Sequence, residues 1–399
     1  MSAIVTVKKG SDVSAVSDYL RKRGIKWDTR ISAKRVFMLD GVSAADAWGL
    51  ELPAYCSVED GDAPVYRGSD NELVFPLIVH RNVSGGSWAP ARTIRVNPPW
   101  PAGAGDSPQR THFECATSGA GVDILMCDSG IHITHDEFGG RASLIYDFYV
   151  GDPVIHNHGT GTSSCAAGNT VGIAREANVF SFRCLNSSNF GSATGILNAV
   201  QEAVDFSAVR PNPAVLNFSI VGDSAGVNAA LDSAIDAGIV VVICAGNDGL
   251  DLGTIDGGFA EEIPDSIVVG GLEWRDGPYY IFPAATGSFP GISCTRYGSR
   301  VDVSAPSQWV KGATNTGDSN YIPLFGTSFG CAFTSGVVAC LLQGQTKPTT
   351  RAQVQAVRTY IQNSAQADVQ NASHTPVQLP NRRLYLDPTL TPPVTIPGL

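Results

Sequence analysis

The chain has 399 residues, of which 43% are hydrophobic and 16% are charged, and its formal net charge is -10. This composition excludes global disorder and predicts a substantial hydrophobic core, and the length allows two or three domains. The negative charge argues against a nucleic-acid groove, which needs a basic face. No run of residues approaches the roughly 18 apolar residues of a membrane helix.

Short elements fill the first 62 residues. Strands are predicted over residues 3–8, 35–41 and 56–61, and helices over residues 13–23 and 43–52. These elements predict a small α+β domain over residues 1–62, followed by a turn-rich linker over residues 63–87. The N-terminus lacks the uninterrupted apolar stretch and the cleavage site of a secretory signal. We therefore expect a cytoplasmic or virion-associated protein, or a secreted one if a leader was removed.

From residue 88 onward, buried-type strands alternate with helical segments. The predicted strands are residues 122–127, 178–185, 214–220, 238–246 and 266–273, and the predicted helices are residues 193–206, 227–238, 331–344 and 350–365. Such alternation predicts an α/β domain whose mostly parallel sheet is covered on both faces. We assign this domain to residues 88–387. The Pro-rich tail over residues 388–399 is predicted to be extended.

The chain has 9 cysteines, an odd number, and none forms a C-x-x-C pair. Most lie in apolar runs, such as VVIC and VVAC. The pattern predicts reduced, buried cysteines rather than a disulfide or zinc framework.

Polar residues stand where four of these segments end or begin. Asp128 follows the first strand of the large domain, His158 lies in HNHGTG, Asn247 follows the strand 238–246, and Ser328 opens an apolar helix. Ligands bind beyond the carboxyl ends of the strands in such sheets. Each residue also has an ordinary explanation as a turn, loop or helix-cap residue.

Together, the four residues supply the parts of an acyl-transfer site. The Ser328 hydroxyl needs a base to act as a nucleophile, and the imidazole of His158 titrates in the right range. A carboxylate such as Asp128 orients the base and stabilises its charged form. The side-chain amide of Asn247 and the backbone N–H of Ser328 are suitable donors to an oxyanion.

The stretches ILMCDSGIHITHDEFGGRA, HNHGTG, VGIA, VLNFSI, VVICAGN and FGTS occur in this order. In these stretches the chain resembles the subtilisin-like serine proteases, nearest to the proteinase K branch, from about residue 88 to about residue 386. The resemblance implies a subtilisin-like three-layer fold and a serine endopeptidase that acts through an acyl-enzyme. It implies Asp128, His158 and Ser328 as the catalytic triad and Asn247 in the oxyanion hole.

The N-terminal part resembles the propeptide inhibitor domain of the same family. This implies a ferredoxin-like β-α-β-β-α-β prodomain that assists folding, inhibits the enzyme and is removed by self-processing of the zymogen. The cleaved bond would lie within the linker 63–87. The partners implied are therefore protein or peptide substrates and the chain's own propeptide, with no nucleic acid and no membrane.

Two segments match those with which the family binds extended peptides. The match implies substrate contacts from Ser219, Ile220, Val221 and Gly222 in NFSIVG and from Gly191 in NSSNFGSA. Val221 stands where the family usually has glycine. We expect its branched side chain to narrow the S1 region and to favour small P1 residues.

The chain also departs from the family around the catalytic residues. It reads HGTGTSSCAAG after the histidine, and after the serine it lacks the usual Pro and His and has Phe329 in place of Met. A catalytically silent binding or scaffold protein is therefore the alternative function.

Two other catalytic schemes find little support in the sequence. A metallohydrolase using His132, His135, His156 and His158 is disfavoured, because the spacings are short and lack a matched acidic ligand. Thiol catalysis by Cys331 is disfavoured by its place in an apolar helix. We predict no metal and no cofactor.

Overall fold

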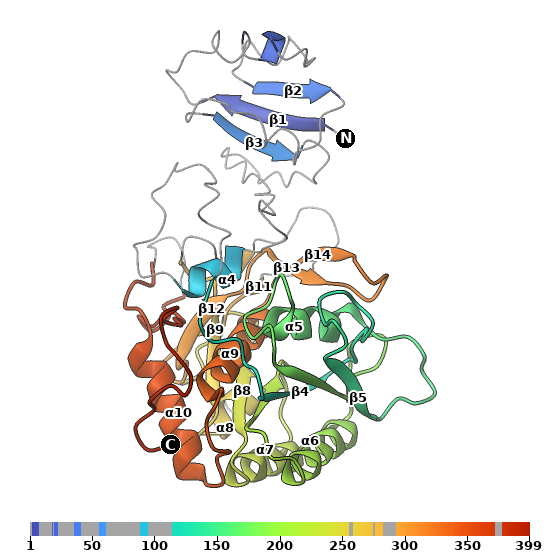
Figure 1. Cartoon of the computed structure of the whole chain (residues 1–399), viewed down its shortest axis with the longest axis vertical. Coiled ribbons are helices and arrows are strands. Elements are labelled where there is room, and N and C mark those ends of the chain that lie inside the picture. The colour runs from blue at the N-terminus through green and yellow to red at the C-terminus, as the bar shows by residue number, and fades with distance from the viewer. Residues whose placement is uncertain are drawn as a thin grey trace. The chain divides into compact units, whose positions relative to one another are not determined.

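The computed structural model describes residues 2–7, 18, 20–22, 36–40, 56–60, 88–94, 114–254, 258–273, 276–281, 293–371 and 377–399. The chain divides into two compact units, drawn in Figure 1. The smaller unit comprises Met1–Gly86, Trp100–His112 and Pro283–Pro290, and the larger unit comprises Ser87–Pro99, Phe113–Phe282 and Gly291–Leu399.

The described part of the smaller unit is an antiparallel sheet of three strands. Its strands β1 (Ser2–Val7), β2 (Val36–Asp40) and β3 (Cys56–Asp60) are ordered β2-β1-β3, with the first strand in the centre. They coincide with the three predicted strands. Residues 20–22 are helical, within the predicted helix 13–23. The helix predicted over residues 43–52 lies outside the described residues.

The larger unit is built on a parallel sheet of seven strands, ordered β12-β9-β8-β7-β4-β6-β5. The strands are β4 (Asp123–Asp128), β5 (Ala142–Asp147), β6 (Asn178–Arg183), β7 (Ala214–Phe218), β8 (Val240–Cys244), β9 (Ile267–Leu272) and β12 (Val303–Pro306). All five strands predicted for this unit are present. Their apolar runs are explained by burial on both faces of the sheet.

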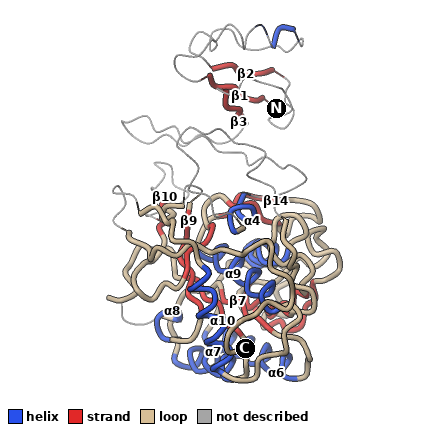
Figure 2. The backbone as a smooth tube through the Cα atoms, turned by 60° about the vertical axis from the view of Figure 1, so that its left-hand side comes forward, coloured by secondary structure: helices blue, strands red, loops and turns tan. Residues whose placement is uncertain are grey.

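Helices cover both faces of this sheet, which confirms the predicted α/β architecture. In Figure 1, α5 (Asn157–Ala167) and α9 (Thr327–Leu342) lie above β4 and β8, whereas α6 (Ala193–Ala208) and α7 (Ala225–Asp236) lie together below these strands. Figure 2 shows α10 (Arg351–Ser364) beside α7. The unit also contains two short helices, α4 (Trp88–Thr93) and α8 (Phe259–Glu262). It is completed by two small sheets of two strands each: β10 (Tyr280–Ile281) with β11 (Ser293–Cys294), and β13 (Val310–Ala313) with β14 (Tyr321–Leu324).

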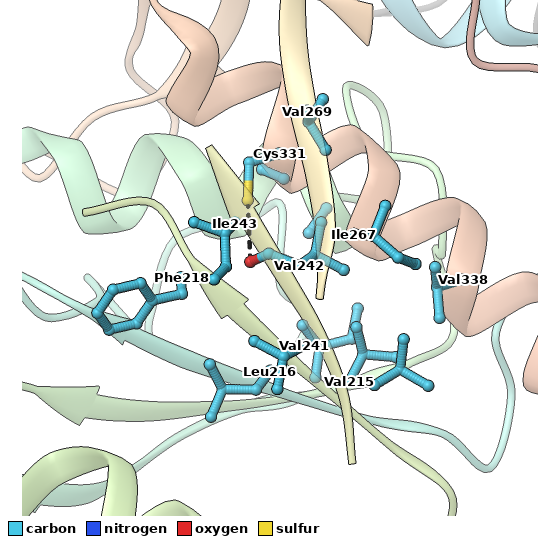
Figure 3. Packing of buried hydrophobic residues seen from close by; sticks show 14 of the residues in the cluster. Val215, Leu216, Phe218, Val241, Val242, Ile243, Ile267, Val269, Cys331 and Val338 are labelled. Carbon is cyan, nitrogen blue, oxygen red and sulfur yellow. Dashed lines mark hydrogen bonds between the residues drawn. The ribbon is translucent and has the colours of Figure 1, made fainter. Parts of the chain in front are cut away.

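The core lies between the sheet and α9, which is buried along its whole length. Figure 3 shows Val242 and Ile267 of neighbouring strands packed with Val338 of α9, and the Sγ of Cys331 donating to the carbonyl oxygen of Val242 at 3.3 Å. Burial raises the pKa of the Cys331 thiol well above its ordinary value. A buried thiol of this kind is not a nucleophile, as the sequence predicted.

The cysteine prediction is confirmed for the described side chains. Eight cysteines are described, all of them unpaired, and seven are buried. No helix among the described residues is both long enough and apolar enough to cross a membrane.

Some elements differ from the predictions. The helix α5, which contains the NHGTG part of HNHGTG, was not predicted, and neither were the strands β5, β12, β13 and β14. The tail 388–399 has no helix or strand, but Val394 and Ile396 are buried against the core of the larger unit.

Close contact between α9 and α5 depends on Gly336. A Cβ atom added there would lie 2.4 Å from the carbonyl oxygen of Ala166 and 2.8 Å from Cβ of Ile173. The Ala166 carbonyl also accepts the N–H of Ala174 at 2.9 Å, so the backbone at Ala166 cannot easily move away from an added Cβ.

We therefore expect Gly336→Ala to lower the free energy of unfolding by about 1–3 kcal/mol through overpacking. Urea unfolding in a Ser328→Ala background, which avoids self-digestion, measures the change. Gly151→Ala is the matched control, because nothing lies within 4 Å of its added Cβ. Equal stability of the two variants would contradict the packing argument.

Candidate active site

The carboxylate of Asp128 lies at the end of β4 and is only 1% exposed. It accepts hydrogen bonds from the backbone N–H of Ser129 at 2.6 Å and from the hydroxyl of Thr162 at 3.1 Å. The Nδ1 atom of His158 lies 2.8 Å from one carboxylate oxygen and 3.0 Å from the other. A carboxylate buried this deeply needs such donors to remain charged.

His158 is the second residue of α5, and the start of this helix fixes its position. The ring Nδ1 of His156 caps the helix by accepting the backbone N–H of His158 at 3.1 Å. The hydroxyl of Ser129 accepts the N–H of Gly159 at 2.9 Å and donates to the carbonyl of His156 at 3.1 Å. The turn after β4 therefore holds the first turn of α5 against Asp128.

The contact with Asp128 fixes both the tautomer and the basicity of His158. Because the carboxylate only accepts, Nδ1 carries a hydrogen and Nε2 is left as the basic nitrogen. Burial of the ring disfavours its charged form, but the charge of Asp128 and the hydrogen bond to it outweigh burial and raise the pKa of His158 above 6.5. The ring thus has the properties of a general base.

Ser328 is the second residue of α9 and follows a glycine turn. Gly326 caps the helix with a φ of 130°, a conformation that disfavours any side chain. The ring of Phe329 lies 5.7 Å from the ring of His158, centroid to centroid, so the first turn of α9 lies beside the imidazole.

The hydroxyl of Ser328 forms a hydrogen bond with Ser219 rather than with His158 in this structure. Its Oγ donates to the carbonyl of Ser219 at 3.4 Å, and the hydroxyl of Ser219 donates to the carbonyl of Ser328 at 2.9 Å. In the described part of the chain, no hydrogen bond joins Ser328 to His158. Rotation about the Cα–Cβ bond of Ser328 is needed to redirect the hydroxyl, and catalytic hydrogen bonds often form fully only with substrate bound.

The side-chain amide of Asn247 is fixed by three donors to its oxygen. The Oδ1 atom accepts the backbone N–H of Thr327 at 2.8 Å, the hydroxyl of Thr327 at 3.0 Å and the hydroxyl of Tyr279 at 2.8 Å. A backbone N–H can only donate, so the oxygen and nitrogen of the amide are distinguished. Among the described residues, Nδ2 has no acceptor, and its hydrogens are available to a ligand.

A second donor is available at the start of α9. Backbone N–H groups in the first turn of a helix have no intrahelical partner, and the positive end of the helix dipole favours negative charge there. The N–H of Ser328 is in this turn.

The predicted substrate-binding residues lie on two segments, which are exposed only in part. Ser219 and Ile220 directly follow β7 and are largely buried, whereas the side chain of Val221 is 52% exposed and Gly222 is exposed. Gly191 precedes α6, and a Cβ there would lie 2.6 Å from the carbonyl oxygen of Cys184. Val221 therefore presents its side chain to solvent.

A model of the subtilase family matches residues 119–380. The chain belongs to the subtilase family. Membership makes this subtilase a subtilisin-like serine endopeptidase, which acts on protein or peptide substrates.

Individual subtilases are similar over different shares of the chain. Subtilisin-like protease 10 of Arthroderma otae is 28% identical over 372 residues, which cover 85% of this chain and 88% of that protein. A cuticle-degrading serine protease of Arthrobotrys oligospora is 28% identical over 254 residues, which cover 61% of this chain and 58% of that protein. A crystal structure of a cold-adapted subtilisin-like serine proteinase aligns with a TM-score of 0.60 and 25% identity, covering 75% of this chain and 97% of that one.

The four histidines considered for a metal site all have other contacts in this subtilase. His132 Nε2 lies 2.8 Å from a carboxylate oxygen of Asp318, and His135 Nε2 lies 2.9 Å from a backbone carbonyl. His156 caps α5, and His158 contacts Asp128. Among the described residues, no group of three or more His, Cys, Asp or Glu side chains is placed to hold a metal ion.

Thr162, Tyr279 and Thr327 are among the residues that support the site but were not predicted from the sequence. Thr162 and Thr327 stand in the quoted motifs HGTGT and GTS, so their hydroxyls could have been recognised there as hydrogen-bond donors to the site. Tyr279 is far from every motif, and no local pattern marks it.

The raised pKa of His158 predicts a pH dependence. The base acts only when neutral, so we expect kcat/KM to fall as the pH drops through a value above 6.5. Asp128→Asn removes the charge that favours imidazolium, so the midpoint should move to lower pH while kcat/KM at neutral pH falls by about 10⁴-fold. His132→Gln is the control and should leave the midpoint in place. The same midpoint for wild type and Asp128→Asn would contradict the role of Asp128.

Proposed function

We propose that this subtilase cleaves peptide bonds with Asp128, His158 and Ser328 as its triad and Asn247 as an oxyanion donor. The Oγ of Ser328 attacks the substrate carbonyl carbon while its proton passes to Nε2 of His158. The carbonyl oxygen becomes an oxyanion and accepts hydrogen bonds from Nδ2 of Asn247 and the N–H of Ser328. The contact between Asp128 and His158, beside the first turn of α9, is the observation that carries the proposal.

The remaining steps use the same groups. The C–N bond breaks as His158 returns its proton to the leaving amine, which leaves an ester on Ser328. A water molecule then loses a proton to His158 and attacks the ester carbonyl, and the acid product departs as the proton returns to Ser328 Oγ.

A catalytically silent binding or scaffold protein is the alternative that the sequence left open, and membership in the subtilase family argues against it. An observation in its favour is the hydrogen bond from Ser328 Oγ to the carbonyl of Ser219, in place of one to His158. The two functions differ in whether the hydroxyl becomes nucleophilic.

A second part of the proposal concerns the N-terminal region. We propose a zymogen with a propeptide over residues 1–62, a processing linker over residues 63–87, a catalytic domain over residues 88–387 and a tail over residues 388–399. The alignment with the Arthroderma otae protease covers 85% of the chain, more than residues 119–399 provide, so the similarity extends before the region that the family model matches. The central place of β1 between two later strands is compatible with a β-α-β-β-α-β unit.

We expect the purified chain to hydrolyse casein and to acquire one fluorophosphonate adduct, located on Ser328. Ser328→Ala should abolish both and should leave the linker 63–87 uncleaved by intact mass. Ser335→Ala is a matched control, since Ser335 is a buried serine two turns further along α9. Casein hydrolysis equal to wild type in Ser328→Ala would remove the assignment. An inert wild-type chain without an adduct would favour the silent protein.

Substrate preference at P1 follows from the exposed side chain of Val221. Peptides that differ only at P1 should be cleaved with higher kcat/KM when P1 is small, and Val221→Gly should improve cleavage after large aromatic residues by about 10-fold or more. Val209→Ala, at another exposed valine, is the control. Preference of the wild type for large aromatic P1 residues would contradict the proposal.

A further inference from the structure

Tyr279 is a buried tyrosine whose hydroxyl reaches the candidate oxyanion donor. Its side chain is fully buried, and its Oη donates to Oδ1 of Asn247 at 2.8 Å. The residue comes from the segment between β9 and β10, some thirty positions along the chain from Asn247. The two donors that Thr327 supplies to the same oxygen come from the start of α9 instead.

Several contacts hold Tyr279 in place. Its backbone N–H donates to the carbonyl of Gly271 at 2.9 Å, and a Cβ at Gly271 would lie only 2.4 Å from the tyrosine ring. Three residues earlier, Asp276 is 1% exposed and pairs with Arg92 of α4 through hydrogen bonds of 2.8 Å and 2.7 Å. The ring therefore fills a closely packed site, and its hydroxyl has a fixed direction.

The loop that carries Asn247 is also held at its backbone. The carbonyl of Asn247 accepts the N–H of Cys294 at 3.0 Å, and the carbonyl of Gly246 accepts the N–H of Arg296 at 2.9 Å. These bonds fix the Cα of Asn247 but leave the amide free to turn about its side-chain bonds. Hydrogen bonds to Oδ1 are what determine the direction of Nδ2.

We propose that Tyr279 is a positioning residue for the oxyanion hole: its hydroxyl orients the Asn247 amide and strengthens Nδ2 as a donor. Donors on Oδ1 withdraw charge from the amide and make its N–H groups better donors, since linked hydrogen bonds polarise one another. An amide already aimed at the site of the oxyanion needs no reorganisation during the reaction. The inference rests on the proposed role of Asn247.

The test is Tyr279→Phe, which keeps the ring and removes the hydroxyl. We expect kcat to fall about five- to tenfold, the rate equivalent of one neutral hydrogen bond, with KM nearly unchanged. The affinity for a peptide aldehyde, whose adduct has an oxyanion, should fall by a similar factor. The affinity of a Ser328→Ala background for the uncleaved peptide should stay the same, since the ground state makes little use of the amide.

Tyr321→Phe is the matched control. Its phenol donates to the buried carboxylate of Glu137 at 2.7 Å, so this substitution also removes a phenol hydrogen bond, at a distance from Asn247 in the sequence. A purely structural role for Tyr279 predicts that both variants lower the melting temperature and neither separates kcat from KM. Equal kcat values for Tyr279→Phe and Tyr321→Phe would overturn the inference.

Asn247→Ala separates this inference from the proposed function. If kcat in Asn247→Ala is unchanged, the proposed oxyanion hole itself is wrong. If Asn247→Ala lowers kcat by about 10²–10³-fold and Tyr279→Phe has no effect, only the role of Tyr279 is wrong. In the double variant, the loss of Tyr279 should have no further effect on kcat.

A second substitution covers the case in which Tyr279→Phe does not fold. Fluorotyrosine at position 279 keeps the ring and the hydroxyl and makes the phenol a stronger donor. We expect it to bind the peptide aldehyde more tightly than wild type does. Unchanged aldehyde affinity would contradict the polarising role.

Discussion

A buried carboxylate is the constraint on which the catalytic unit depends. Asp128 is almost inaccessible to solvent, and its charge is tolerated because a backbone N–H, a hydroxyl and an imidazole all donate to it. The hydroxyl and the imidazole both belong to α5, so satisfying Asp128 places this helix over the end of β4. Because α5 packs against α9, it also places the first turn of α9 beside His158. The contacts that allow Asp128 to be buried in the fold are therefore the same contacts that pair it with His158.

Much of the fold could be predicted because its signals are local. An apolar run such as Val240–Cys244 is expected in a strand that is buried on both faces of a sheet. The amphipathic segments between such runs are then expected to be the helices that cover the sheet. The helix α5 could not be predicted in this way. Its residues Gly159–Ala167 are buried all round, so they carry no helical alternation of polar and apolar residues, and its cap is a histidine ring rather than a common capping residue.

The candidate site was predictable to a similar degree. Asp128, Asn247 and Ser328 each stand at the end of a predicted strand or the start of a predicted helix, and the topology of a parallel sheet gathers such positions at one edge. The rotamer of Ser328 could not be predicted, since its hydrogen bond goes to the backbone carbonyl of Ser219, more than a hundred residues away in the sequence. Tyr279 could not be predicted for the same reason, because its proposed role depends on a hydrogen bond to Asn247, which lies in another segment of the chain.

The central claim is that Ser328, His158 and Asn247 act on one carbonyl group. A crystal structure with a peptidyl boronic acid tests it most directly, because boron forms a tetrahedral adduct with a serine nucleophile. The account predicts a bond from boron to Oγ of Ser328, one boronate oxygen within hydrogen-bond distance of Nδ2 of Asn247, and His158 Nε2 in contact with the adduct. Boron bound to another residue, or Ser328 still donating to Ser219 beside an unmodified inhibitor, would contradict it.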